Sequence, residues 1–239
     1  MVAESQHLKV ILCRCTTDQL FSEFVVSHLL SSDEDQSTIQ SILAWAIYGA
    51  RPLTIGEMTE AVSRGYGLQS NIVTCGYIFS LLTSVFAGIL EIQYNEIRIP
   101  NRRLMLMFTA DTVPSETKRI WHNLRESADF IIAKACLDYL CLPNIQKEMG
   151  EQFGTWCSGL IALPHHHERN SLCLYAVEMW PAHFAKLSNA PHLLHNLLKS
   201  DLGRLWASAF WSISNPATRP PPPHRVFISN ICRARLGLY

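Results

Sequence analysis

The sequence lacks an excess of charge of either sign, because 20 lysines and arginines are balanced by 20 aspartates and glutamates. Proteins that bind nucleic acids in general gain affinity by neutralising phosphates, which requires a basic surplus. The balance therefore disfavours a general nucleic-acid binder. Hydrophobic residues make up 48% and charged residues 17% of the 239 residues. This composition excludes a disordered chain and allows one large domain or two small ones.

Membrane and export signals are also missing. No uninterrupted apolar run reaches the roughly 18 residues that suggest a membrane-spanning helix. The initial sequence MVAESQHLKV has no basic flank followed by a long apolar core, which a secretory signal requires. We therefore expect no membrane association and a cytoplasmic location.

Disulfide and redox spacings are missing as well, although the chain has eight cysteines. Cys13 and Cys15 do not have the two-residue spacing of redox motifs, and a chain of this length and apolar content does not need disulfides. Cys75, Cys136 and Cys173 lie in apolar periodic segments, where a thiol packs as a small hydrophobe. The expected state of the cysteines is reduced.

No catalytic or cofactor motif stands out. The G-x-x-x-x-G-K-[ST] pattern of a phosphate-binding loop does not occur. His165, His166 and His167 are adjacent and have no cysteine or carboxylate at a fixed ligand spacing, so they predict a solvated loop rather than a metal site. His122 and His183 stand close to tryptophans in helical patterns and are interpreted as packing residues. We expect no catalytic residue, no cofactor and no metal.

The sequence does contain clear signals for where helices begin and end. Ser37 and Gln40 form a capping box at the start of a first helix, and Pro52 disfavours helical geometry at Arg51 and ends that helix. The apolar residues of the helix share one face: Ile39, Ile42, Leu43, Ala46, Ile47 and Ala50.

A second helix is predicted directly after this proline. Thr54 and Glu57 form another capping box, with Leu53 and Met58 at the two hydrophobic staple positions around it. The apolar stripe and the end of the second helix are set by Met58, Ala61, Val62 and Gly65. The two helices therefore predict a tight corner.

Residues 71–86 predict a third helix and residues 90–100 a β-hairpin. Two short alternating runs on either side of Tyr94 and Asn95 indicate the hairpin. Three helices followed by a hairpin are the order of a winged helix. In such a domain the third helix would enter the DNA major groove, yet residues 71–86 contain no lysine or arginine, so DNA reading is disfavoured. One side of this helix carries Ile72, Cys75, Phe79, Leu82 and Phe86.

The remainder predicts a helical domain. A long helix over 115–142 starts at a capping Ser115 and cannot continue past Pro143. Further helices are expected at 171–187, where Pro181 breaks or kinks the chain, and at 192–212. The predicted fold is mainly α: an N-terminal segment (1–36), a winged helix (37–110), a helical domain (111–214) and a proline-rich linker that leads into the start of a truncated repeat-like helix (215–239).

Four stretches form an ordered set: ILAWAIYGARPLTIGEMTEAV (42–62), ADFIIAKACLDYL (128–140), LYAVEMWPAHFAKL (174–187) and FWSISNPATRPPPPHRVFISNICRARLGLY (210–239). Together they resemble the fungal NACHT-type signalling ATPases of the STAND class, which are the fungal relatives of animal NOD-like receptors. In that family a similar corner lies in the winged helix that follows the nucleotide-binding domain, and the later helices lead to a repeat array. The resemblance implies a segment between the NTPase core and the repeats, without either.

The same resemblance implies a role and its limits. In the family, the winged helix packs on the nucleotide domain, helps to hold the ADP-bound state and carries a histidine near the end of the wing strand. Asn101 stands at about that position here, so the likeness does not extend to this histidine and the resemblance gives no support for nucleotide sensing.

We therefore expect a non-catalytic interaction or relay module that binds a nucleotide-binding NACHT domain in cis or in trans. Three alternatives stay open: a truncated product without an independent role, an accessory or tailoring protein of a metabolite pathway, and a winged-helix DNA binder. The residues expected to set the corner and a later helix junction are Arg51, Pro52, Leu53, Glu57, Trp180, Pro181 and His183.

Overall fold

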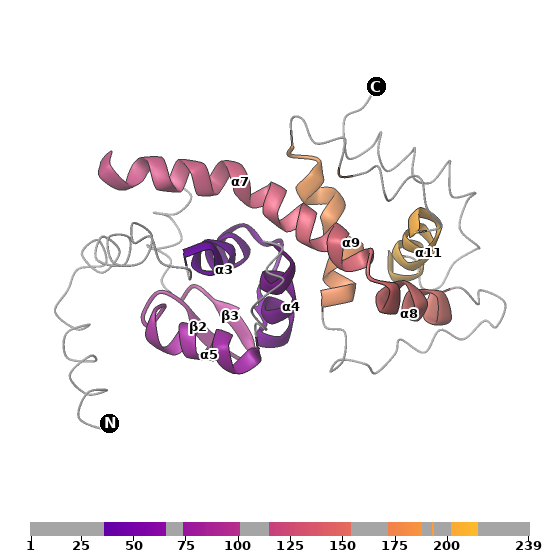
Figure 1. Cartoon of the computed structure of the whole chain (residues 1–239), viewed down its shortest axis with the longest axis horizontal. Helices are drawn as coiled ribbons and strands as arrows, with labels where there is room; N and C mark the ends of the chain where they lie inside the picture. The colour runs from indigo at the N-terminus through magenta and orange to yellow at the C-terminus, as the bar shows by residue number, and fades with distance from the viewer. Residues whose placement is uncertain are drawn as a thin grey trace. The chain divides into compact units, whose positions relative to one another are not determined.

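A computed structural model describes residues 36–65, 74–100, 115–153, 172–187, 193 and 202–214. Within these residues the fold is mainly helical, as expected, with seven helices and one three-stranded sheet (Figure 1). The helices are α3 (Gln36–Tyr48), α4 (Ile55–Gly65), α5 (Cys75–Ser84), α7 (Ser115–Leu140), α8 (Pro143–Phe153), α9 (Leu172–Phe184) and α11 (Leu202–Ser214). The strands are β1 (Leu53–Thr54), β2 (Glu91–Gln93) and β3 (Glu96–Arg98).

The chain divides into two compact units, Met1–Thr59 with Ile72–Ala128 and Glu60–Asn71 with Asp129–Tyr239. The border falls within α4 and within α7, so each of these helices contributes residues to both units. The four domains expected from the sequence, with borders at residues 36, 110 and 214, remain a prediction. In the part of the chain that the structure describes, no helix combines the length and the apolar character needed to cross a membrane.

The first helix, α3, is buried on almost every side. Its expected stripe is partly confirmed, because Ala50 is exposed beyond the helix end at Tyr48. The helix already includes Gln36, so Ser37 lies in its first turn and the capping box predicted there is wrong. Its buried apolar side chains are Ile39, Ile42, Leu43, Ala44, Trp45 and Ile47.

A glycine ends this helix for a steric reason. The N–H of Gly49 donates to the carbonyl of Trp45 at 3.1 Å. A Cβ at position 49 would lie 2.4 Å from that same oxygen, closer than side-chain carbons and backbone oxygens approach. The chain therefore needs a residue without a side chain before it turns into the corner.

The predicted hairpin is confirmed. Ile92 of β2 pairs with Ile97 of β3, and the two-residue turn between the strands is Tyr94-Asn95. Both turn residues have positive φ, 53° and 65°, as a type I′ turn requires. Strand β1 was not predicted; it pairs with β3 on its other side and gives the order β1-β3-β2. Two residues are too few to show an alternating pattern.

Helix α5 is shorter than predicted, and its buried face differs from the predicted one. Thr74 caps it, because its side chain accepts from the N–H of Tyr77 at 3.1 Å. Cys75 and Phe79 were expected on the buried side and are exposed. Apolar residues occur all round this helix, so their spacing alone could not select the buried face. The buried face consists of Ile78, Leu81 and Leu82.

The long helix α7 is confirmed over most of the predicted range. Seven apolar residues at helical spacing are buried: Leu124, Ala128, Ile131, Ile132, Ala135, Tyr139 and Leu140. Pro143 does prevent continuation, but it also starts α8, which the sequence analysis missed. Proline suits the first position of a helix, where its missing N–H would have no partner anyway. In the second unit α11 packs beside α8 and α9 (Figure 1).

Candidate functional site

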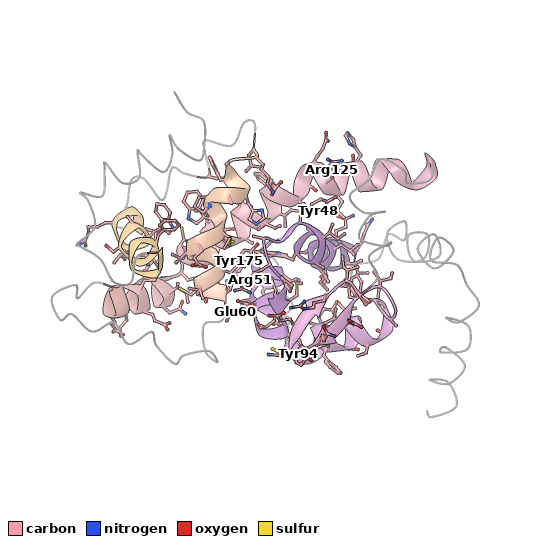
Figure 2. The ribbon with its side chains drawn as sticks, turned by 180° about the vertical axis from the view of Figure 1, so that it is seen from behind. Tyr48, Arg51, Glu60, Tyr94, Arg125 and Tyr175 are labelled. Atoms are coloured by element: carbon pink, nitrogen blue, oxygen red, sulfur yellow. The ribbon has the colours of Figure 1, made fainter. Side chains whose placement is uncertain are left out.

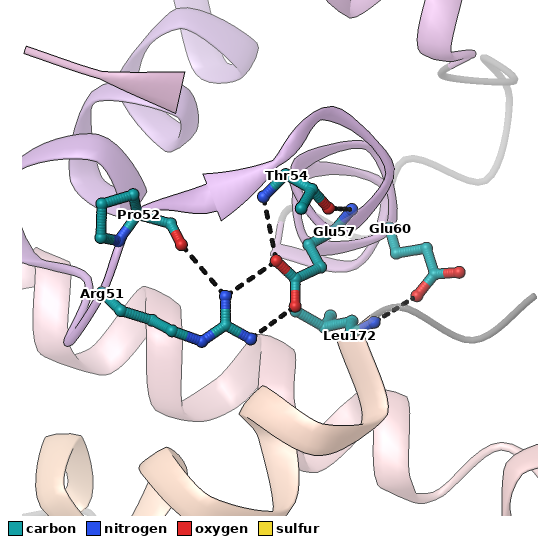
Figure 3. A network of polar contacts seen from close by, with 6 residues as sticks. All are labelled: Arg51, Pro52, Thr54, Glu57, Glu60 and Leu172. Carbon is teal, nitrogen blue, oxygen red and sulfur yellow. Dashed lines mark hydrogen bonds and ion pairs between the residues drawn. The ribbon is translucent and has the colours of Figure 1, made fainter. Parts of the chain in front are cut away.

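The corner between α3 and α4 is held by an ion pair between Arg51 and Glu57. Arg51 Nη2 donates to Glu57 Oε1 at 2.6 Å, and Nη1 donates to Oε2 at 2.9 Å and to the Pro52 carbonyl at 3.0 Å (Figure 3). Two parallel bonds between a guanidinium and a carboxylate are stronger and more directional than one. Glu57 is only 4% exposed, so the guanidinium compensates a carboxylate that would otherwise be buried without a counter-charge.

The same carboxylate caps α4. The backbone N–H of Thr54 donates to Glu57 Oε2 at 2.9 Å, and the N–H of Glu57 donates to Thr54 Oγ1 at 3.2 Å. These reciprocal bonds confirm the capping box predicted from the spacing. Leu53 and Met58, at the staple positions, are both buried. Four of the residues singled out in the sequence therefore meet at one corner: Arg51, Pro52, Leu53 and Glu57.

The other three residues singled out, Trp180, Pro181 and His183, lie in α9 and are buried. His183 Nδ1 lies 2.7 Å from Asp129 Oδ1, and its Nε2 lies 2.9 Å from the hydroxyl of Tyr175. Because a carboxylate only accepts, Nδ1 carries the proton, and in the neutral ring Nε2 accepts from the tyrosine. His183 is thus a satisfied core histidine, and its burial leaves no face open for a substrate.

Asp129 ties this network to α7. Lys186 Nζ donates to the same Oδ1 at 3.1 Å. Burial by itself raises the pKa of Asp129, but the hydrogen bonds from His183 and Lys186 and the positive charge of Lys186 outweigh it and hold the pKa below its ordinary value. The carboxylate is therefore ionised at neutral pH and fastens α9 to α7.

Pro181 does not break α9, which continues to Phe184. Proline has no N–H to give to the carbonyl four residues earlier, which here belongs to Val177. That carbonyl accepts from the indole N–H of Trp206 in α11 at 2.9 Å. Trp206 also packs edge-on against Trp180, with ring centroids 5.1 Å apart. A side chain from another helix thus replaces the missing backbone donor, so α9 continues through the proline and the break, one of the two predicted outcomes, does not occur.

The start of α9 is capped by a residue that the sequence analysis missed. The N–H of Leu172 donates to Glu60 Oε2 at 3.1 Å, across 112 residues of sequence (Figure 3). A carboxylate there is favoured by the positive end of the helix dipole. Burial, followed by the charges of Glu148 and Glu60, raises the pKa of Cys173 to about 12. The thiol stays protonated, which makes it a poor nucleophile.

The remaining candidates from the sequence are histidines, cysteines and Asn101, and some of them lie outside the described residues. His122 is exposed and pairs with Glu126 at 3.1 Å, so its interpretation as a packing residue is wrong. The described cysteines, Cys75, Cys136, Cys141 and Cys173, are free. Among the described residues no group of three or more His, Cys, Asp or Glu side chains could hold a metal. The positions that lie outside the described residues are Cys13, Cys15, Asn101, His165, His166 and His167.

The hairpin turn carries a feature that the sequence analysis also missed. Tyr94 has a φ of 53° and is 91% exposed at the end of the hairpin (Figure 2). Type I′ turns favour Asn-Gly, and a bulky residue in the left-handed region is a steric outlier. On β3, Arg98 Nε donates to Glu96 Oε2 at 3.0 Å. The ring of Tyr94 therefore lies in solvent on a backbone conformation that tyrosine rarely adopts.

Comparison with known proteins gave no match to a protein-family model, a curated protein or a solved structure. The class that the fold and the sites define is accordingly a mainly helical protein of two compact units, with a salt-bridged corner in one and a buried polar and aromatic network in the other.

Proposed function

We propose that the chain is a non-catalytic relay module, built as a winged helix followed by a helical domain. The observation that carries the proposal is the connectivity. Elements α3, β1, α4, α5, β2 and β3 follow one another, and the antiparallel sheet has the order β1-β3-β2. A helical corner followed by a third helix and a hairpin, with the short strand between the first two helices added to the sheet, is the order expected of a winged helix and supports this part of the proposal.

The charges on this unit support a protein partner rather than DNA. A helix that reads the major groove needs Arg, Lys, Asn or Gln aimed at base edges and cations near the phosphates. Arg98 in the hairpin is already paired with Glu96. The exposed side of α5 is instead neutral and consists of Cys75, Gly76, Phe79, Ser80, Thr83 and Ser84. Such a surface suits packing against another protein.

The partner in this proposal is the nucleotide-binding domain of a NACHT-type receptor, bound in cis or in trans inside the cell. It rests on the four stretches that resemble those receptors. The residues that carry the first stretch, Arg51 to Glu57, form the salt-bridged corner, and the WP pair of the third stretch is built into the Trp206 contact. Both motifs thus make defined contacts within the chain, which supports the resemblance. Any nucleotide would be held by the partner.

Two measurements test this function. The tagged full chain, purified from its source cells, should carry a P-loop NTPase identified by mass spectrometry, and the purified NTPase domain should bind the chain in solution. The transcript should be read across both ends, because a longer product with a P-loop upstream would place the partner in cis. A chain that remains monomeric, captures no P-loop protein and has no such upstream segment would reject the proposal.

A further inference from the structure

Helix α4 carries two carboxylates that hold two different parts of the chain. Glu57 accepts both bonds of the Arg51 guanidinium and the N–H of Thr54, and so fixes the corner. Glu60 accepts the N–H of Leu172 at 3.1 Å and so caps the start of α9 (Figure 3). Residues three apart in an α-helix are neighbours on its surface, with Cβ atoms about 5–6 Å apart. The two carboxylates therefore extend from neighbouring positions on one side of the same helix.

The helix that joins these carboxylates passes from one compact unit to the other. The border lies between Thr59 and Glu60, so Glu57 belongs to the first unit and Glu60 to the second, while α4 runs without interruption from Ile55 to Gly65. An α-helix holds the angle between its residues nearly constant, because each turn is hydrogen-bonded to the next. A rotation of the first turn of α4 about the helix axis is therefore passed on to Glu60.

The bond from Leu172 is sensitive to such a rotation. Side chains extend to about 5–6 Å from the axis of an α-helix, so a rotation of roughly 20° moves a carboxylate by about 2 Å. Hydrogen bonds from N–H groups to oxygen rarely exceed about 3.2 Å, and this one is already 3.1 Å long. Loss of the Arg51–Glu57 ion pair, which fixes the first turn of α4, should thus release the cap of α9.

We propose that α4 is the coupling element of the relay, so that the salt-bridged corner controls whether the start of α9 is capped. The inference rests on the proposed function in one respect, since it names the element through which that relay acts. Because the Arg51 side chain is 36% exposed, a partner can reach it, and a contact that separates Arg51 from Glu57 changes α9. The coupling itself needs no partner, because both contacts lie within the chain.

Hydrogen exchange of single backbone amides, followed by NMR on the full chain, tests the coupling. In Arg51→Ala the amide of Leu172 should exchange at least about fivefold faster than in the wild type. The amide of Ala207, in the buried part of α11, reports opening of the second unit as a whole and should change less than about twofold. The control variant is Ile78→Val, which shortens a buried side chain of α5 in the same unit as Arg51 and should leave exchange at Leu172 unchanged. Unchanged exchange at Leu172 in Arg51→Ala, or an equal increase at both amides, would overturn the proposal.

The reciprocal variant is Glu60→Ala, which removes the acceptor for Leu172 and leaves Arg51 and Glu57 in place. Two coupled equilibria change each other by the same factor, so the amide of Thr54 should now exchange faster by a factor within about twofold of that seen at Leu172 in Arg51→Ala. An effect in one direction only would reject the coupling. The receptor partner is tested separately. A chain that shows the reciprocal effect but captures no P-loop protein supports the coupling and rejects the proposed function, and the converse result rejects the coupling alone.

Discussion

At the scale of single residues, the corner depends on one guanidinium. Among the described residues, Arg51→Ala leaves the nearly buried carboxylate of Glu57 with only the N–H of Thr54 as a donor. Hydrogen bonds to charged groups contribute roughly 1.5–3 kcal/mol each. Because the Arg51 side chain is 36% exposed, water replaces part of the interaction, and we expect a loss of about 1–2 kcal/mol. Urea unfolding followed by circular dichroism measures it.

Arg51→Lys is the matched variant for this prediction. It retains the positive charge but loses the planar fork that reaches both carboxylate oxygens. It should therefore recover less than half of the stability that Arg51→Ala loses. Full recovery would mean that charge alone holds the corner and that the two-bond geometry contributes nothing.

Replacing two glycines of the first unit by alanine should change the stability in opposite directions. Gly49→Ala places a Cβ 2.4 Å from the backbone oxygen of Trp45, and no side-chain rotation relieves that contact, so we expect a loss of about 1–3 kcal/mol. Gly76→Ala adds a Cβ whose nearest neighbour is Thr74 Oγ1 at 3.8 Å. In that exposed turn of α5 alanine should stabilise by up to about 1 kcal/mol. Thermal unfolding of both variants measures the two changes in stability. A change of the same sign in both would contradict the geometry.

At the scale of secondary-structure elements, α9 tolerates its proline through a bond from α11. Trp206→Phe keeps an aromatic ring against Trp180 but removes the N–H that reaches the Val177 carbonyl. A buried acceptor left without a donor costs about 1–3 kcal/mol. In a Pro181→Ala background the new backbone N–H can serve that carbonyl, so the cost of Trp206→Phe should shrink by about 1 kcal/mol. Purely additive effects in the double-mutant cycle would refute this account.

The link between α7 and α9 should show in the acid range. The folded pKa of Asp129 lies below its ordinary value of 3.8, so its stabilising contribution is fully present above about pH 5 and is lost as the pH falls through the folded value. Asp129→Asn removes that contribution at every pH. The stability curves of wild type and variant should therefore differ by about 1–3 kcal/mol at neutral pH and converge as the pH falls below the folded pKa of Asp129.

Asp138→Asn on the same helix is the control. Asp138 pairs with Lys134 one turn away and is 48% exposed, and surface pairs of this kind contribute less than about 0.5 kcal/mol. It should leave the pH profile unchanged. A constant gap between wild type and Asp129→Asn from neutral to acid pH would mean that the carboxylate acts through packing and not through its charge.

The separation in sequence between contacting residues explains which features could be predicted. Thr54 and Glu57 are three residues apart, and the hairpin strands adjoin their turn, so local spacing was enough. Asp129 and His183 are 54 residues apart and Trp206 and Val177 are 29 apart, so only the folded chain brings them together. Helix α8 was missed because, among those of its residues whose burial is described, only Ile145 and Met149 are apolar and buried, which is too sparse a pattern to detect.

At the scale of the whole molecule, hydrophobic periodicity was sufficient for the mainly helical class but not for the division into units. The border between the units falls inside α4 and α7, and a helical pattern carries no mark where it passes from one core to the next. Packing must therefore be tested with probes spread over the chain.

Cysteine reactivity is such a probe. Cys75 is exposed and Cys136 is buried, and burial raises the pKa of both Cys136 and Cys173, the latter to about 12. Because the thiolate is the nucleophile, iodoacetamide at mildly alkaline pH should modify Cys75 at least about tenfold faster than the other two. Peptide mass spectrometry gives the three rates separately, and concentrated urea should make them equal. If Cys173 reacted as fast as Cys75 in the native protein, the packing of the start of α9 against Glu60 would be wrong.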